Sequence, residues 1–284
     1  MNKILLSSTI AAFLTCAALP FANAQELELN WYENVQKLLD QGQNAAAKDS
    51  LRAHSESTSD AEERIRATMA LAQIALSEND WENYDALVQN LEQLFDNSPR
   101  IAASWRAPYQ YLMAQSQRLR GEEDKAQNTL RLLQLELEEQ NKKRATTQWL
   151  GLVAFERALL LSHDNPQARK LADLAIDSFQ STKNASMLGY SLILLAKLEW
   201  ERDKTRRAYN LYNDAIRAFR QDASSGESVV RTHVLVAKRL ASEGRIRAAQ
   251  QRIALAEQVL EVLGTNDALR ELIDNTQLQL QNSP

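Results

Sequence analysis

Apolar residues recur every three to four positions in two adjacent segments between Ser191 and Arg220. That spacing places them on one face of a helix in each segment. A polar run, Glu201 to Lys204, separates the two segments. The stretch therefore predicts a hairpin of two amphipathic helices. The apolar positions are Leu192, Leu195, Ala196 and Leu198, then Ala208, Tyr212, Ala215 and Phe219.

The same pattern returns 41 residues later, at 232–263, with Gly244 at its turn. Four weaker copies span 31–54, 61–95, 108–137 and 146–179. A period of about 40 residues is typical of helical-repeat proteins, in which each hairpin covers the apolar surface of its neighbour. We expect six hairpins, closed by a capping helix at 267–281. The first small site of the second helices is occupied by Ala47, Tyr84, Ala126, Ala168, Ala208 and Ala249.

Composition agrees with a helical chain. The 284 residues include seven glycines and five prolines, and the strong helix formers Ala, Leu, Gln, Glu and Arg are abundant. No segment shows the sustained alternation of a half-buried strand. The sequence predicts an all-α fold, a solenoid of about six antiparallel helix hairpins.

The first 24 residues form a separate segment. Lys3 precedes an apolar run from Ile4 to Ala22, and Ala22-Asn23-Ala24 supplies the small residues of a cleavage site. We therefore predict a signal peptide at 1–24 and a mature domain at 25–284, in the periplasm or secreted. The alternative is an uncleaved membrane anchor, since the run is about long enough to span a thin bilayer. A lipoprotein is disfavoured, because the residues before Cys16 are not small.

The mature chain has no cysteine and a formal net charge of −5 once Lys3 is removed. It therefore has no disulfide and no thiolate metal site. A mildly acidic balance gives no reason to expect nucleic acid as a partner. After cleavage we also expect no stable membrane insertion.

Small, large and small residues at Ala208, Tyr212 and Ala215 resemble the second helix of a tetratricopeptide repeat, and Leu195-Ala196 resembles its first helix. The resemblance covers roughly 31–263 and implies a superhelical binding scaffold. The repeats here are longer than the 34 residues of that family, and Glu156 stands where a small residue is expected. A HEAT-like solenoid, whose period is nearer 40, is therefore the alternative.

Residues with catalytic or metal-binding chemistry are few. His54, His163 and His233 lie in different repeats without paired ligand spacing, and we expect them to be solvated. No phosphate loop, nucleophile elbow or metal motif is present in the sequence. We expect no enzymatic activity, no metal and no cofactor.

In tetratricopeptide proteins the first helix of each pair lines the concave face. The resemblance then places Arg157, Lys197 and Lys238 at equivalent inward sites of three repeats, with Gln73 and Gln115 at the same site in two earlier repeats. A basic and aromatic stripe of this kind suits an acidic segment of a partner. The alternative is that these are ordinary residues of amphipathic helices, with Tyr190 and Trp200 in the core. One helical turn away the stripe adds Tyr111, Arg118, Tyr190, Trp200 and Arg231.

A solenoid offers an extended surface for binding. The sequence therefore predicts a non-enzymatic scaffold or adaptor of the bacterial cell envelope that holds a partner protein or peptide on its concave face. One alternative is a periplasmic receptor for a small ligand. Another is an accessory subunit or hydrolase, which the lack of a nucleophile and base pair disfavours.

Overall fold

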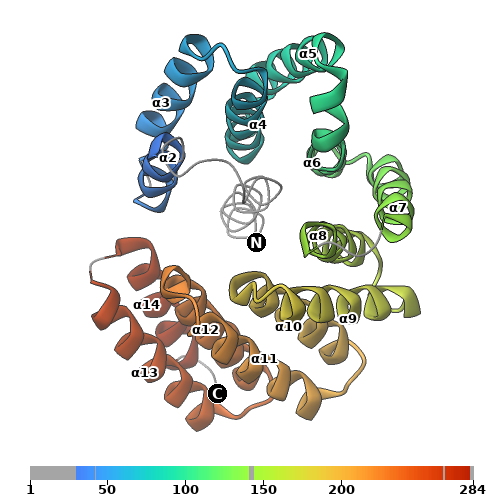
Figure 1. Ribbon diagram of the computed structural model, residues 1–284. Helices are drawn as coiled ribbons and strands as arrows, with labels where there is room; N and C mark the ends of the chain where they lie inside the picture. Colours follow the sequence, from blue (N-terminus) through green and yellow to red (C-terminus); the bar gives the residue numbers. More distant parts are fainter. Residues whose placement is uncertain (1–29, 42, 141–143, 265, 282–284) are drawn as a thin grey trace. The chain divides into compact units, whose positions relative to one another are not determined.

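The computed structural model describes residues 30–41, 43–140, 144–264 and 266–281 (Figure 1). The predicted signal peptide at 1–24 lies outside these residues. Within them the chain forms successive helices and a short 3₁₀ turn, η2 (Ala223–Ser225), and no strand. The helices are α2 (Asn30–Asp40), α3 (Asn44–Ser57), α4 (Ala61–Glu78), α5 (Trp81–Asn97), α6 (Pro99–Leu119), α7 (Glu123–Glu139), α8 (Arg144–Leu160), α9 (Pro166–Ser181), α10 (Ala185–Trp200), α11 (Thr205–Phe219), α12 (Gly226–Ser242), α13 (Ile246–Leu263) and α14 (Asp267–Gln281).

These helices confirm the expected all-α fold and the order of its hairpins. The chain divides into two compact units, with unit 1 ending at Leu160 and unit 2 beginning at Leu161. Five of the six expected hairpins lie within one unit. The remaining hairpin, at 146–179, contributes α8 to unit 1 and α9 to unit 2. A single domain over 25–284 stays a prediction.

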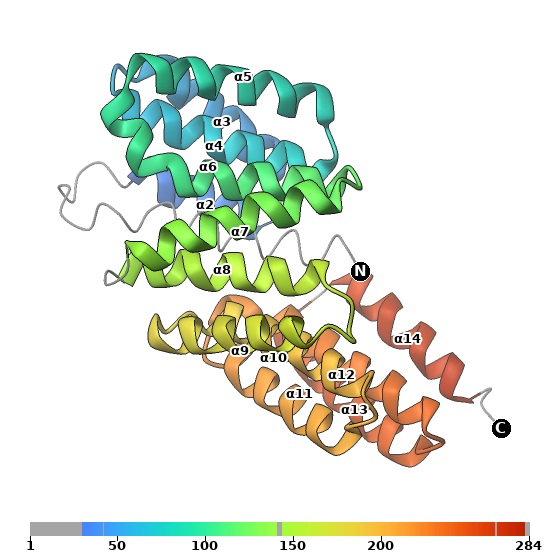
Figure 2. The same cartoon turned by 90° about the vertical axis from the view of Figure 1, so that its right-hand side faces the viewer.

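In unit 1 each helix from α2 to α8 packs against the next. The first helices of the hairpins also touch one another, α4 against α6 and α6 against α8. They form a row on one side of the unit, with α3, α5 and α7 on the other (Figure 1). Figure 2 shows α7 and α8 lying side by side along their lengths. This two-row stack is what hairpins produce when each one covers its neighbour.

Unit 2 continues the same scheme from α9 to α14. Each helix packs on the next, and α12 also contacts α14, so the capping helix joins the row of first helices. One apolar cluster runs through α10, α11, α12, α13 and α14. Ala208, Tyr212 and Ala249 are central to it, each with a fully buried side chain.

The small sites explain the repeat. Tyr84 is 2% exposed and the alanines at the five equivalent positions are 0% exposed, so all six are buried where second helices meet their neighbours. Alanine allows helix axes to approach to the close end of the usual 8–10 Å range. The turn predicted at Gly244 is confirmed, with a φ angle of 72°. Asn79 and Gly121, in the turns after α4 and α6, also have positive φ angles, of 58° and 79°. A residue in that conformation ends a helix and is easiest for glycine or asparagine.

Helix starts follow from short polar side chains. Asp60 accepts hydrogen bonds from the backbone N–H groups of Glu62 and Glu63 before α4. Asn165 accepts one from Gln167 N at 2.9 Å, and Pro166 occupies the first position of α9. These bonds satisfy donors that a helix leaves free at its N-terminus. Among the described residues, no helix combines the length and apolar character needed to cross a membrane.

Candidate functional site

The equivalent positions of the predicted stripe differ strongly in exposure. Gln73 and Gln115 are buried, at 0% and 1% exposed, while Lys238 is exposed. Arg157 and Lys197 are half-buried, and burial lowers the pKa of both side chains. The positive charge of Arg239 lowers the pKa of Lys197 further. Of these five side chains, that of Lys238 is the exposed one.

Arg157 points toward α7, the second helix of the preceding hairpin. Its Nε donates to Gln127 Oε1 at 3.3 Å, and its Nη1 donates to Gln134 Oε1. Gln127 Nε2 in turn donates to the backbone carbonyl of Arg157 at 3.1 Å. This side chain joins α8 to α7 within unit 1.

The aromatic members of the stripe are packing residues. Tyr111 is fully buried, and its hydroxyl accepts a hydrogen bond from Gln115 at 3.4 Å. Tyr190 is 9% exposed and lies edge-on to Phe219, with ring centroids 5.0 Å apart. The Arg239 guanidinium covers the ring of Trp200 at 4.9 Å. These contacts agree with the alternative interpretation, in which Tyr190 and Trp200 are core residues.

Two arginines of the stripe are paired with carboxylates. Arg231 lies 3.7 Å from Glu227, one helical turn earlier on α12. Arg118, on α6, forms an ion pair with Glu156 on α8. Glu156 occupies the small site of its first helix, and its side chain is only 1% exposed. Lys238 remains as the exposed cation of the predicted set.

A second buried carboxylate, Glu199, lies at the end of α10 with 0% side-chain exposure. Three cations surround it: Arg169 at 3.2 Å, and Lys204 and Arg207 at 3.8 Å each. They come from α9, from the turn after α10, and from α11. A buried charge is tolerated only when it is compensated in this way.

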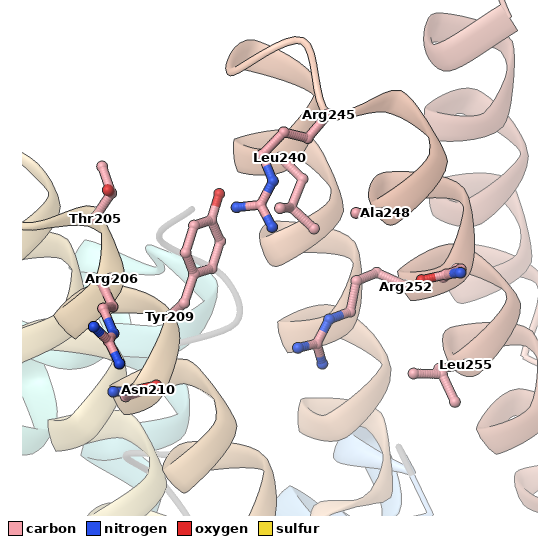
Figure 3. Close-up of a pocket in the computed structure, with 10 residues that line it drawn as sticks. Thr205, Arg206, Tyr209, Asn210, Leu240, Arg245, Ala248, Arg252 and Leu255 are labelled. Atoms are coloured by element: carbon pink, nitrogen blue, oxygen red, sulfur yellow. The ribbon is translucent and has the colours of Figure 1, made fainter.

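A pocket that sequence reasoning missed lies in unit 2, between α11 and α13 (Figure 3). Its volume is about 610 Å³. Arg245 and Arg252 extend from the α13 side toward α11, where Arg206, Tyr209 and Asn210 lie. Leu240, at the end of α12, forms part of the wall. Thr205, Ala248, Gln251 and Leu255 complete the lining.

The pocket is basic. Three of the lining residues are arginines and none is acidic, as far as the described residues extend. Arg252 donates to Asn213 Oδ1 at 2.7 Å, a neutral partner on α11. One carboxylate, Glu243, stands beside the pocket, where it accepts from the Tyr209 hydroxyl at 2.9 Å and lies 3.4 Å from Arg245. Burial, followed by the bond to Glu243, raises the pKa of Tyr209.

His233 lies in the interior of α12, only 2% exposed, and no hydrogen-bond partner is found for either ring nitrogen within the described residues. Burial, followed by the positive charges of Arg252 and Arg220, lowers its pKa from 6.5 to about 4. The prediction that it is solvated is wrong, because its position on α12 faces the core. His54 is also partly enclosed, stacked on Trp31 with ring centroids 3.8 Å apart. His163 is exposed in a turn, as expected.

A sequence signal for the pocket exists but is weak. Arg245 and Arg252 are seven residues apart, a spacing that puts two side chains on one face of a helix. Which face meets α11 depends on how the hairpins stack. Within the described residues, no group of three His, Cys, Asp or Glu side chains is placed to hold a metal ion.

Comparison with known proteins supports the fold. No protein-family model matches the sequence, and no curated protein matches it. Among solved structures, the chain is similar to the apo form of the quorum sensor NprR from B. thuringiensis, with a TM-score of 0.54 and 15% sequence identity. The similarity covers 89% of this chain and 70% of that chain. Together with the helix order, it supports a tetratricopeptide-like repeat fold.

Proposed function

We propose that this protein is a non-enzymatic scaffold that binds another protein or a peptide. The observation that carries the proposal is the arginine-lined pocket between α11 and α13. Its guanidinium groups match the geometry of carboxylates, and its tyrosine and leucine give a partner apolar surface to bury. Repeat proteins use extended surfaces of this kind for partner binding.

The cell envelope is the proposed place of action, on the ground of the signal-peptide pattern at 1–24. Sequencing the N-terminus of the protein purified from cells tests this part. A mature start at Gln25 supports export. An unprocessed Met1 contradicts it.

Photo-crosslinking in intact cells tests the binding function. A photoreactive residue at Asn210, an exposed residue of the pocket, is expected to give a discrete adduct with one partner protein. The same residue at exposed Ala254, on α13 but outside the pocket lining, is the matched control. Adducts absent from both positions, or identical at both, contradict the proposal for this surface.

The concave-face stripe is the second proposed contact surface, with Lys238 as its exposed residue. Lys238→Glu replaces a cation without breaking any ion pair found in the described residues. A lower yield of the same adduct in this variant would extend the interface onto the first helices. An unchanged yield limits the interface to the pocket between α11 and α13.

A small-ligand receptor is the alternative function. The observation in its favour is the pocket volume of about 610 Å³, which lies within the range of small-molecule sites. Native mass spectrometry of the protein purified from cells distinguishes the two. A bound small molecule that is lost in Arg252→Gln favours the receptor.

A further inference from the structure

The pocket continues into an apolar track along α13. Ala248, Arg252, Leu255, Val259 and Val262 are spaced four, three, four and three residues apart, so they share one face of the helix. Leu255 is 38% exposed and Val262 is 88% exposed, and Val259 between them is partly buried against the core. The basic pocket and this track therefore lie along one face of α13, and we call the two together, from Arg245 to Val262, the α13 groove.

We propose that the α13 groove binds a polarised segment of a partner protein, with carboxylates at one end and apolar side chains at the other. This inference rests on the proposed function and names the chemistry of its partner. Carboxylates would pair with Arg206 and Arg252, and apolar side chains would cover Leu255, Val259 and Val262.

Charge supports this orientation of the partner. Arg206 is exposed, and its side chain makes no ion pair or hydrogen bond within the described part of the chain. Arg252 is held by the neutral Asn213, so its charge is not cancelled by that contact. Burial is the main cause of the lowered pKa of His233, and the positive charges of Arg252 and Arg220 lower it further. At the other end Glu261 is exposed beside Val262, which disfavours a second carboxylate there.

The track also sets the length of the segment. Arg252 and Val262 are ten residues apart on α13, which corresponds to about 15 Å along the helix axis. An extended peptide covers that distance with about five residues. A helical partner needs about ten residues.

Fluorescence anisotropy with the purified mature protein tests the inference. The probe is a fluorescein-labelled peptide with the sequence Glu-Asp-Ala-Leu-Gly-Val-Leu, beside a Gln-Asn version with the same apolar residues and a version with serine in place of Leu and Val. We expect the acidic, apolar peptide to bind at least about tenfold more tightly than either, since each lost contribution is worth about 1.4 kcal/mol or more. Equal affinities for all three overturn the inference.

Matched variants locate the site. Arg206→Glu is expected to lower the affinity for the acidic peptide by about tenfold or more. Leu255→Asp is expected to lower it by a similar factor. Arg247→Glu, on α13 but outside the pocket lining, makes the same charge change and is expected to alter affinity less than about twofold. Equal losses for Arg206→Glu and Arg247→Glu would indicate non-specific attraction and overturn the inference. So would full displacement of the peptide by inorganic phosphate, which indicates a small-anion site.

The photo-crosslinking experiment distinguishes failure of this inference from failure of the scaffold function. If Asn210 captures a partner protein but the acidic peptide does not bind, the inference fails and the scaffold function stands. If Asn210 captures nothing and the peptide does not bind, both fail. Capture that is lost in Arg206→Glu and kept in Arg247→Glu supports both.

Discussion

Arg118 and Glu156 form an ion pair between α6 and α8, two first helices of successive hairpins in unit 1. Glu156 stands where the other hairpins have Ala72, Ala114 and Ala196. Its side chain is 1% exposed, whereas that of Arg118 is 21% exposed. The pair is therefore asymmetric: water reaches the cation but not the carboxylate.

That asymmetry predicts unequal costs of removing the two partners. Arg118→Ala leaves a buried carboxylate without its cation and should reduce the free energy of unfolding by about 3–5 kcal/mol. Glu156→Ala leaves a cation that water can reach, with alanine at a site that accepts it elsewhere, and should cost about 1 kcal/mol. Urea unfolding measures both.

The double variant, Arg118→Ala with Glu156→Ala, is the control for this pair. It should be more stable than Arg118→Ala alone, because no charge is left buried. If the double variant loses the sum of the two single-variant losses in unfolding free energy, Arg118 does not stabilise the Glu156 carboxylate.

Ala208→Leu should destabilise unit 2 by about 1–3 kcal/mol through overpacking. The reason is that Ala208 is fully buried at the small site of α11, where a larger side chain has no room. Ala254→Leu makes the same change at an exposed position of α13 and should leave the thermal melting curve nearly unchanged. Equal melting temperatures for the two variants would contradict the assigned helix register.

Because the pKa of His233 is lowered in the folded protein, we expect the protein to lose stability in mild acid. Its pKa is about 4 in the folded protein and near 6.5 when unfolded, so between these values the unfolded chain binds the extra proton. The stability present above pH 6.5 should fall as the pH drops, by about 3 kcal/mol in total at pH 4. Urea unfolding between pH 7 and pH 4 measures this slope.

The slope should shrink in His233→Leu, because Leu192 and Leu152 occupy the equivalent positions of α10 and α8 and no proton is then bound. His163→Leu, at the exposed histidine, should keep the slope of the unaltered protein. A slope that His233→Leu leaves intact would assign the acid sensitivity to other groups.

Binding in the α13 groove should raise the pKa of His233. A carboxylate placed near Arg252 offsets part of the positive charge that now lowers that pKa. Titration of the His233 ring by NMR, with and without the acidic peptide, measures the change. A bound peptide that leaves the pKa of His233 unchanged would place the carboxylates away from Arg252.

The candidate site was less predictable than the fold. Arg157, Lys197 and Lys238 do share one register, but the contacts of Arg157 with Gln127 and Gln134 depend on where α7 lies beside α8. Likewise, the sequence does not distinguish Arg245 and Arg252 from other polar helix residues, because they line a pocket only where α11 lies opposite them. Side chains that meet across hairpins are distant in sequence, and no local pattern encodes their contact.

The sequence by itself determined the helices, their turns and the hairpin period. Helical periodicity, alanine at Ala208 and Ala249, and glycine at Gly121 and Gly244 are local properties of the chain. Only the tertiary structure decided that Glu156 is buried against Arg118, that His233 faces the core, and that α11 and α13 leave a basic pocket between them. The physical reason is that burial and charge pairing depend on the helices stacked alongside, whereas helix formation depends mainly on neighbours within a few residues.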